Sequence, residues 1–117
     1  MSPLDEQKIT DLIELMSFDG FVELVGSYQE SSAGHFENLL KAIADNDLDL
    51  LKFAAHSLKG GSANIGAKSL SELFLQLEQA ASNGELGDDI HHLIEQIKEM
   101  YQTVLVALRE KITNGEG

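Results

Sequence analysis

Apolar residues recur every three or four positions along most of this chain, which is the spacing of one buried face on an α-helix. The longest such series consists of Ile90, Leu93, Ile94, Ile97, Tyr101, Val104, Leu105, Leu108 and Ile112. No segment shows the two-residue alternation of a β-strand, and the only proline stands at position 3. The pattern therefore predicts an all-α protein.

Breaks in the pattern define two helices in the first part of the chain. Ser2 is the expected N-cap of a short helix, because Pro3 suits a first turn and Asp5 follows three residues after Ser2. A turn is expected at residues 17–20, and the apolar series then continues over residues 21–43 as a long second helix.

Three more helices are predicted in the rest of the chain. Asp47 is the expected cap of a helix that ends near Asn64, where Gly66 can take the left-handed conformation. Residues 69–72 match a capping box for the next helix, which Asn83 and Gly84 end. After a polar loop at 85–88, the long C-terminal series forms the last helix.

Short connections between amphipathic helices predict an up-and-down antiparallel four-helix bundle with a short additional helix at the N-terminus. We expect a single domain over residues 1–117, in which residues 113–117 form a disordered tail. One bundle that closes its own core also predicts a monomer.

Charge and composition exclude several classes of function. Twenty acidic and eight basic residues give a net charge of −12, which argues against nucleic acid or an anionic membrane as a partner. Cysteine is absent, so neither disulfides nor thiolate chemistry are expected. No apolar run reaches the length of a membrane span, and the N-terminus lacks the pattern of a signal peptide. The expected location is the cytoplasm.

One histidine lies just outside the buried stripe of the third predicted helix. That stripe consists of Leu51, Ala55, Leu58, Ser62 and Ile65. His56 stands about 100° around the helix axis from Ala55, on the side that Lys52, Lys59, Gly60 and Ala63 share. Two consecutive glycines in a helix cost about 1 kcal/mol each relative to alanine. Accepting that cost beside an exposed imidazole indicates that something large approaches the ring.

The residues around His56 resemble the active helix of histidine-phosphotransfer (HPt) domains, the carriers of two-component phosphorelays. The matching positions are Ala55, His56, Leu58, Lys59, Gly60, Ser62, Gly66 and Ala67. The resemblance continues into the next helix with Leu70, Leu73, Leu77 and Glu78. Gly61 departs from the family pattern, in which serine or alanine is usual.

The resemblance implies that His56 accepts a phosphoryl group from the aspartate of one receiver domain and passes it to another. The expected partners are the receiver domains of a hybrid sensor kinase and of a response regulator. Lys59 can offset phosphate charge, and Gly60 leaves room for the receiver. Glu78 matches the family position that often faces the histidine, with Gln79 and Gln76 as alternatives. Gly61 and Ser62 keep the packed side of the helix slim. The Mg²⁺ ion is expected on the receiver, so no metal site or cofactor of the chain's own is predicted.

Two other functions remain open from the residues alone. The bundle could act as a non-catalytic helical adaptor that binds signalling partners without transferring phosphate. It could also bind a transition metal through His91, His92 and Glu95, although this set offers too few ligands for a strong site. Kinase activity is not expected, because no glycine-rich nucleotide loop follows a strand.

Overall fold

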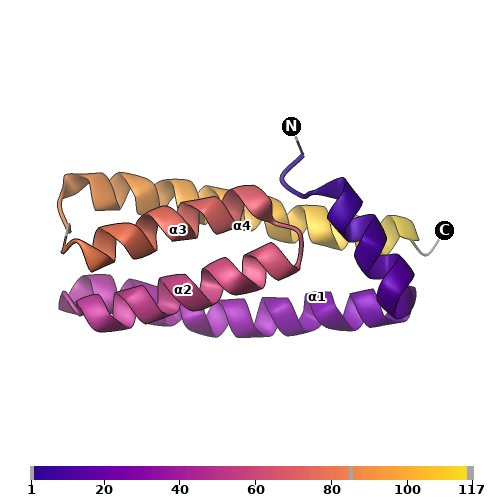
Figure 1. Ribbon diagram of the computed structural model, residues 1–117, viewed down its shortest axis with the longest axis horizontal. Coiled ribbons are helices and arrows are strands. Elements are labelled where there is room, and N and C mark those ends of the chain that lie inside the picture. Colours follow the sequence, from indigo (N-terminus) through magenta and orange to yellow (C-terminus); the bar gives the residue numbers. More distant parts are fainter. Residues whose placement is uncertain (1, 85, 116–117) are drawn as a thin grey trace.

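The computed structural model describes residues 2–84 and 86–115, and this part of the chain folds into four α-helices without any strand. The helices are α1 (Glu6–Asp45), α2 (Leu48–Asn64), α3 (Lys68–Ser82) and α4 (Asp88–Gly115). Each runs antiparallel to the next, and α1 and α4 extend past the α2–α3 turn at one end (Figure 1). The predicted all-α, up-and-down bundle is confirmed.

The additional N-terminal helix is present as the first part of α1. At Ser17 the backbone leaves the helical region, with φ 70° and ψ 166°, and the chain bends there. The Ser17 hydroxyl accepts a hydrogen bond from the Gly20 backbone N–H and so caps the segment that follows. In Figure 1 the segment before the bend turns back over the end of the bundle. The predicted turn at 17–20 is thus a kink centred on one residue.

The N-terminal cap differs from the prediction. Asp5, and not Ser2, is the N-cap of α1, and its carboxylate accepts from the Lys8 N–H at 3.2 Å. The Asp5 N–H itself donates to the Gly66 carbonyl at 2.7 Å, while Leu4 is buried. Because this contact ties Asp5 to the α2–α3 turn, the helix begins only at Glu6. The prediction that placed the cap at Ser2 was therefore wrong.

The start of α3 also differs. The predicted capping box at 69–72 lies inside the helix, and Ala67 is the N-cap without any side-chain hydrogen bond. The α2–α3 turn is short and buried, with Gly66 at φ 86° and the Ala67 N–H bonded to the Ser62 carbonyl at 2.8 Å. The backbone of this turn leads directly into α3, so the helix starts at Lys68, before the first residue of the expected capping box.

Helix α3 ends where the sequence predicts, whereas α4 extends further than predicted. Asn83 follows α3 and Gly84 takes φ 73°, as the sequence predicts for a helix stop. Helix α4 continues through residues 113–115, which were expected to belong to a disordered tail. Residues 116 and 117 of that tail, and Glu85 of the polar loop, lie outside the described residues.

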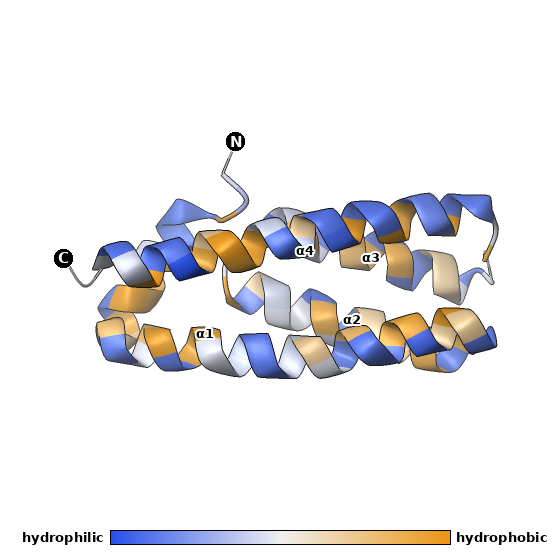
Figure 2. Ribbon diagram, turned by 180° about the vertical axis from the view of Figure 1, so that it is seen from behind, coloured by the Kyte–Doolittle hydropathy of each residue, from blue (hydrophilic) through white to orange (hydrophobic). Residues whose placement is uncertain are grey.

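The core runs along the axis of the bundle and draws on all four helices. Its largest fully buried side chains are Phe21, Phe74, Leu39, Leu51, Leu58, Ile65, Leu70, Leu77, Ile97 and Leu108. Seen from behind, α4 is largely hydrophilic with an orange stretch in its C-terminal part, while hydrophobic and hydrophilic residues alternate along α1 (Figure 2). Val106, in that part of α4, is exposed. None of the described helices has the length and apolar character that crossing a membrane requires.

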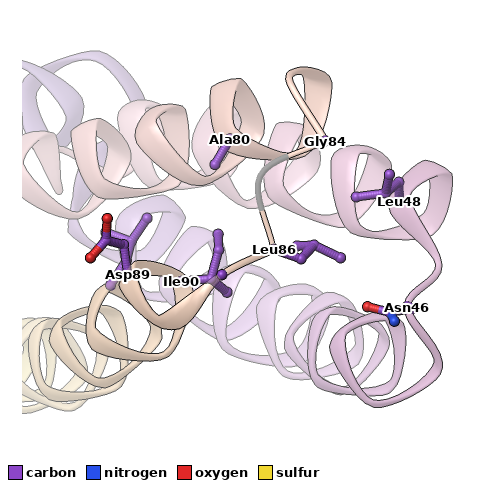
Figure 3. A pocket seen from close by; sticks show the side chains of 9 residues that line it. Asn46, Leu48, Ala80, Gly84, Leu86, Asp89 and Ile90 are labelled. Carbon is purple, nitrogen blue, oxygen red and sulfur yellow. The ribbon is translucent and has the colours of Figure 1, made fainter.

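A hollow of about 820 Å³ opens at the end of the bundle where the α1–α2 turn meets the α3–α4 connection (Figure 3). Asn46, Leu48, Ala80, Leu86 and Ile90 are among the residues that line it. None of its lining residues belongs to the smaller hollow beside His56 described below.

Candidate functional site

Helix α2 places His56 on its open side. The side chain of His56 is 66% exposed, whereas Ala55, Leu58 and Ser62 on the opposite side are buried. Asp47 starts this helix by accepting from the Leu50 N–H at 3.0 Å, as predicted. The spacing of apolar positions therefore placed the histidine on the correct face.

Glu78 of α3 holds the imidazole. Its Oε2 lies 2.7 Å from Nδ1 of His56, and only 15% of the Glu78 side chain is exposed. An ionised carboxylate can only accept hydrogen bonds, so Nδ1 of a neutral ring carries the proton in this contact. The lone pair then resides on Nε2, which makes Nε2 the nucleophilic nitrogen.

Lys59 binds the other oxygen of the same carboxylate. Its ammonium donates to Oε1 of Glu78 at 2.6 Å. The hydrogen bond from Lys59 is the main cause that lowers the pKa of Glu78 below its ordinary value, and the bond from His56 acts in the same direction against partial burial. The resemblance implied that Lys59 offsets phosphate charge, and in the structure its ammonium is paired with Glu78.

Ser71 connects the same two helices. Its hydroxyl donates to the backbone carbonyl of Lys59 at 2.9 Å, one turn beyond His56. Ser71 and Glu78 stand seven residues apart and therefore share one face of α3. Three side-chain hydrogen bonds thus join α3 to α2 around the ring of His56. Ser71 lies within the predicted capping box at 69–72, and the spacing of residues within one helix does not indicate a contact to another helix.

The two glycines after Lys59 face different surroundings. Gly60 is exposed, and a Cβ built there would meet no atom within 4 Å. Gly61 lies against the ring of Tyr28 in α1, with a Cβ position 3.8 Å from that ring. Ser62 is fully buried, and its hydroxyl lies 3.0 Å from the Tyr28 hydroxyl. Burial of Tyr28 raises its pKa to about 12. Ser62 therefore contacts α1 and not the ring of His56.

An apolar hollow of about 410 Å³ lies next to the ring. Asp49, Lys52, Phe53, His56 and Glu78 line it. Phe53 is 60% exposed, and Ala63 is also exposed. The ring of His35, in α1, lies edge-on to Phe53 with 6.3 Å between the centroids. Helical periodicity does not relate His35 to Phe53, because the two residues lie on different helices.

The remaining candidates lie apart from the ring. Gln79 is exposed and lines a different hollow with Lys52 and Glu78, and Gln76 faces α4. Among the described residues, only Glu78 forms a side-chain hydrogen bond with His56. His91 and His92 are exposed in the first turns of α4, and no group of three or more potential metal ligands occurs in residues 2–84 and 86–115.

Comparison with known proteins identifies the family. The model of the Hpt domain matches residues 23–107, which include α2, α3 and the site around His56. The chain belongs to the Hpt domain family. Its function is accordingly histidine phosphotransfer in a phosphorelay. The match lies inside the single domain predicted over residues 1–117, whose extent stays a prediction.

Individual Hpt relatives agree with this assignment. The chain is 25% identical over 103 residues to the phosphorelay protein LuxU from two strains of Vibrio vulnificus, YJ016 and CMCP6, covering 88% of this chain and 90% of each relative. The crystal structure of histidine-containing phosphotransfer protein B from Pseudomonas aeruginosa PAO1 is similar with a TM-score of 0.87 and 31% identity. The alignment covers 95% of both chains, so the similarity extends over the whole bundle.

Proposed function

We propose that His56 is the residue that carries the phosphoryl group of this Hpt domain, and that its Nε2 atom is the acceptor. The observation that supports this assignment is the contact between Nδ1 and Glu78 on a side chain that is 66% exposed. The contact occupies one ring nitrogen and leaves the lone pair of the other for an incoming partner.

The proposed donor is an aspartyl phosphate on a receiver domain. The Nε2 lone pair attacks phosphorus, an N–P bond forms, and the bond from phosphorus to the aspartyl oxygen breaks, which returns the electron pair to the carboxylate. Nδ1 keeps its proton, so positive charge develops on the ring next to Glu78. Transfer to a second receiver is the reverse of these steps. Phosphoryl transfer requires mainly in-line positioning and charge compensation, which explains how a small bundle can support it.

The remaining parts of the reaction are proposed to come from the partner. The receiver supplies the aspartate and the Mg²⁺ ion, while this chain acts as a monomeric carrier without kinase activity of its own. Lys52 lines the hollow beside the ring, Lys59 follows one turn after His56, and Lys68 begins α3, so three of the eight basic residues of the chain fall within or next to this motif in the sequence. These cations favour approach of an acidic receiver pocket to a protein whose net charge is −12.

Phosphoryl uptake tests the proposal directly. Receiver domains labelled from a radioactive low-molecular-weight phosphodonor are mixed with the protein and Mg²⁺, and label stable to alkali but labile to acid is followed. We expect the wild type and His92→Gln, which removes an exposed histidine of α4, to take up label, and His56→Gln to take up none while its circular dichroism spectrum stays unchanged. Wild-type protein that takes up no label from any cognate receiver would favour the adaptor function instead. Label that persists in His56→Gln would assign the reaction to another residue.

A further inference from the structure

A groove lies between α1 and α4, on a part of the surface that the proposed reaction does not use. It has a volume of about 340 Å³, and its lining is mainly apolar. The residues that line it are Ala33, Phe36, Glu37 and Leu40 of α1 and Lys98, Tyr101 and Gln102 of α4. The reactive ring and the carboxylate that holds it belong to α2 and α3 instead. Figure 2 shows the bundle from the side of α1 and α4.

The core holds the floor of this groove in place. The rings of Phe36 and Tyr101 stack with 5.0 Å between their centroids and 22° between their planes. The Tyr101 hydroxyl lies 2.7 Å from the hydroxyl of the buried Ser32, and Phe36 and Tyr101 are each only 9% exposed. Side chains that are already ordered lose little conformational entropy when a partner binds. The floor is therefore formed before any partner arrives.

The outer part of the groove on α1 is apolar and open to solvent. Leu40 and Ala33 stand seven residues apart, so they share one side of the helix. Leu40 is 40% exposed, and Ala33 is also exposed. The short side chain of Ala33 leaves space beside the stacked rings for a large apolar side chain from outside. Covering these apolar groups with such a side chain removes them from water and favours binding.

The two edges of the groove carry opposite charges. On α1, Glu30 and Glu37 are exposed and stand seven residues apart, so they share one side of that helix. On α4, Lys98 and Arg109 are exposed and stand eleven residues apart, which is about three turns. In the described part of the chain Glu30, Glu37 and Arg109 form no ion pair, and Lys98 pairs with Glu95 of its own helix at 3.4 Å. The acidic edge and the basic edge therefore do not neutralise each other.

We propose that this groove binds an amphipathic helix of another protein. That helix places a large apolar side chain on the floor, basic residues over the edge of α1 and acidic residues over the edge of α4. Grooves of this kind recognise helices through apolar residues three or four positions apart, and complementary charges at the edges select among them. Because the groove and His56 lie on different pairs of helices, the bound partner leaves the ring open to a receiver domain.

A synthetic helical peptide of about five turns tests the proposal. It carries leucines at the three-and-four spacing of one stripe, lysines along one edge and as many glutamates along the other, while a scrambled peptide of the same composition has no stripe. Amide chemical shifts of ¹⁵N-labelled protein are followed up to about 1 mM peptide. We expect shift changes centred on residues 29–41 and 98–109 with the first peptide only. No changes, equal changes with both peptides, or changes centred on His56 would overturn the proposal.

Substitution of an exposed leucine tests the apolar contact. Leu40→Gln should weaken binding of the peptide about tenfold, as loss of a central apolar anchor does. Leu75→Gln is the matched control, because Leu75 is 39% exposed but lies on α3. Its affinity for the peptide should equal that of the wild type. Equal affinities of the two variants would show that the leucine in the groove makes no contact, and would overturn the proposal.

Charge reversals test the two edges separately. Glu37→Lys and Lys98→Glu should each weaken binding about threefold or more, although they change the net charge of the chain in opposite directions. Glu72→Lys, at an exposed position of α3, changes the net charge by as much as Glu37→Lys and should leave the affinity unchanged. Equal weakening by Glu37→Lys and Glu72→Lys would mean that only the overall charge matters, which contradicts the proposal.

The same groove could instead hold a second copy of the chain, and sedimentation without peptide distinguishes the two occupants. A monomeric wild type is expected; a dimer that Leu40→Gln dissociates would assign the groove to self-association and overturn the proposal. The binding experiments need neither receiver nor phosphate, so their outcome is separate from that of the uptake experiment. His56→Gln should accordingly bind the peptide as tightly as the wild type, and a loss of binding in this variant would show that the two sites overlap.

Discussion

The two sides of α2 place opposite demands on neighbouring residues. On the packed side, Leu58 and Ser62 are buried against the rest of the bundle, and Gly61 lies against Tyr28 of α1. On the open side, His56 and Gly60 face solvent. Residues 60 and 61 are both glycine, yet they differ in their surroundings. Gly61 leaves room for Tyr28 of α1, whereas Gly60 borders open solvent.

This difference separates stability from function within a single helix. Burial of apolar side chains on the packed side stabilises the fold by about 1.5–3 kcal/mol for each large residue. The open side contributes little burial, so its residues can meet the needs of a partner. Three side-chain hydrogen bonds, formed by Ser71 and Glu78, join the open side to α3. If stability and function are separated in this way, the two sides can be changed independently.

The largest expected effect is on the free energy of unfolding and follows from truncating a buried side chain on the packed side of α2. Leu58→Ala removes a side chain that is 1% exposed and should lower the free energy of unfolding by about 2–5 kcal/mol. Phe53→Ala, on the exposed surface one turn before His56, should change it by less than about 0.5 kcal/mol. Denaturant unfolding followed by circular dichroism measures both. Similar losses for the two variants would show that the sides are not separate.

The next effect concerns function and comes from Gly60. Gly60→Gln places a bulky, uncharged helix former in open space, so we expect the free energy of unfolding to rise by up to about 1 kcal/mol. Transfer from a phosphorylated receiver should nevertheless slow about tenfold or more, because the side chain holds the partner away from the ring.

Gly61→Ala is the matched control for Gly60→Gln. A Cβ at residue 61 would make ordinary van der Waals contact with Tyr28, so stability should rise by about 1 kcal/mol with transfer unchanged. The comparison of the two sides would fail if Gly60→Gln transferred phosphate at the wild-type rate, or if Gly61→Ala slowed transfer as strongly as Gly60→Gln.

A smaller effect on stability is expected at the contact between α1 and the packed side of α2, where the hydroxyls of Tyr28 and Ser62 meet. Tyr28→Phe leaves the buried hydroxyl of Ser62 without its partner, which should cost about 1 kcal/mol of stability. Replacing both groups, as Tyr28→Phe with Ser62→Ala, should recover part of this loss, because no polar group is then left unpaired. Chemical denaturation of the single and double variants checks this. Uptake of label by His56 should not change, since Tyr28 and Ser62 lie on the far side of the helix.

Rules that act within one helix predicted much of this arrangement correctly. The three-and-four spacing put Leu58 and Ser62 inside and His56 outside. Asp47 caps α2 and Gly66 takes a positive φ, as their positions in the sequence indicated. The resemblance to HPt domains directed attention to Glu78, which does bind the ring. Each of these features depends on residues close together in the sequence or on a known motif.

Contacts between distant segments account for the features that the sequence did not reveal. The N-cap of α1 is Asp5 and not the predicted Ser2, because the Asp5 N–H donates a hydrogen bond to the Gly66 carbonyl. The predicted capping box at 69–72 lies inside α3, and Ser71 within it bonds the carbonyl of Lys59 in α2. The pairing of Lys59 with Glu78 joins residues that are 19 positions apart, and helical periodicity relates only residues on the same helix.

The smallest expected effect is a pH dependence at the point where the open side is tied to the bundle. Glu78 has a lower pKa in the folded protein than in the unfolded chain. As the pH falls, the folded protein therefore binds fewer protons at this carboxylate than the unfolded chain does. The stability that Glu78 contributes is therefore complete above its unfolded pKa and is lost as the pH drops through the folded pKa. Partly exposed ion pairs of this kind contribute about 0.2–1 kcal/mol.

Unfolding free energies of the wild type and Glu78→Gln, measured from pH 7 down to pH 3, give this contribution as the gap between the two curves. We expect a gap of about 0.5 kcal/mol at pH 7 that closes in acid, because the protonated carboxyl then resembles the amide. Glu72→Gln, on an exposed position of α3, controls for the general loss of a carboxylate from this acidic protein. A gap that stays constant down to pH 3 would mean that the charge of Glu78 does not help to join α3 to the open side of α2. Its bond to His56 would then hold the ring by geometry alone.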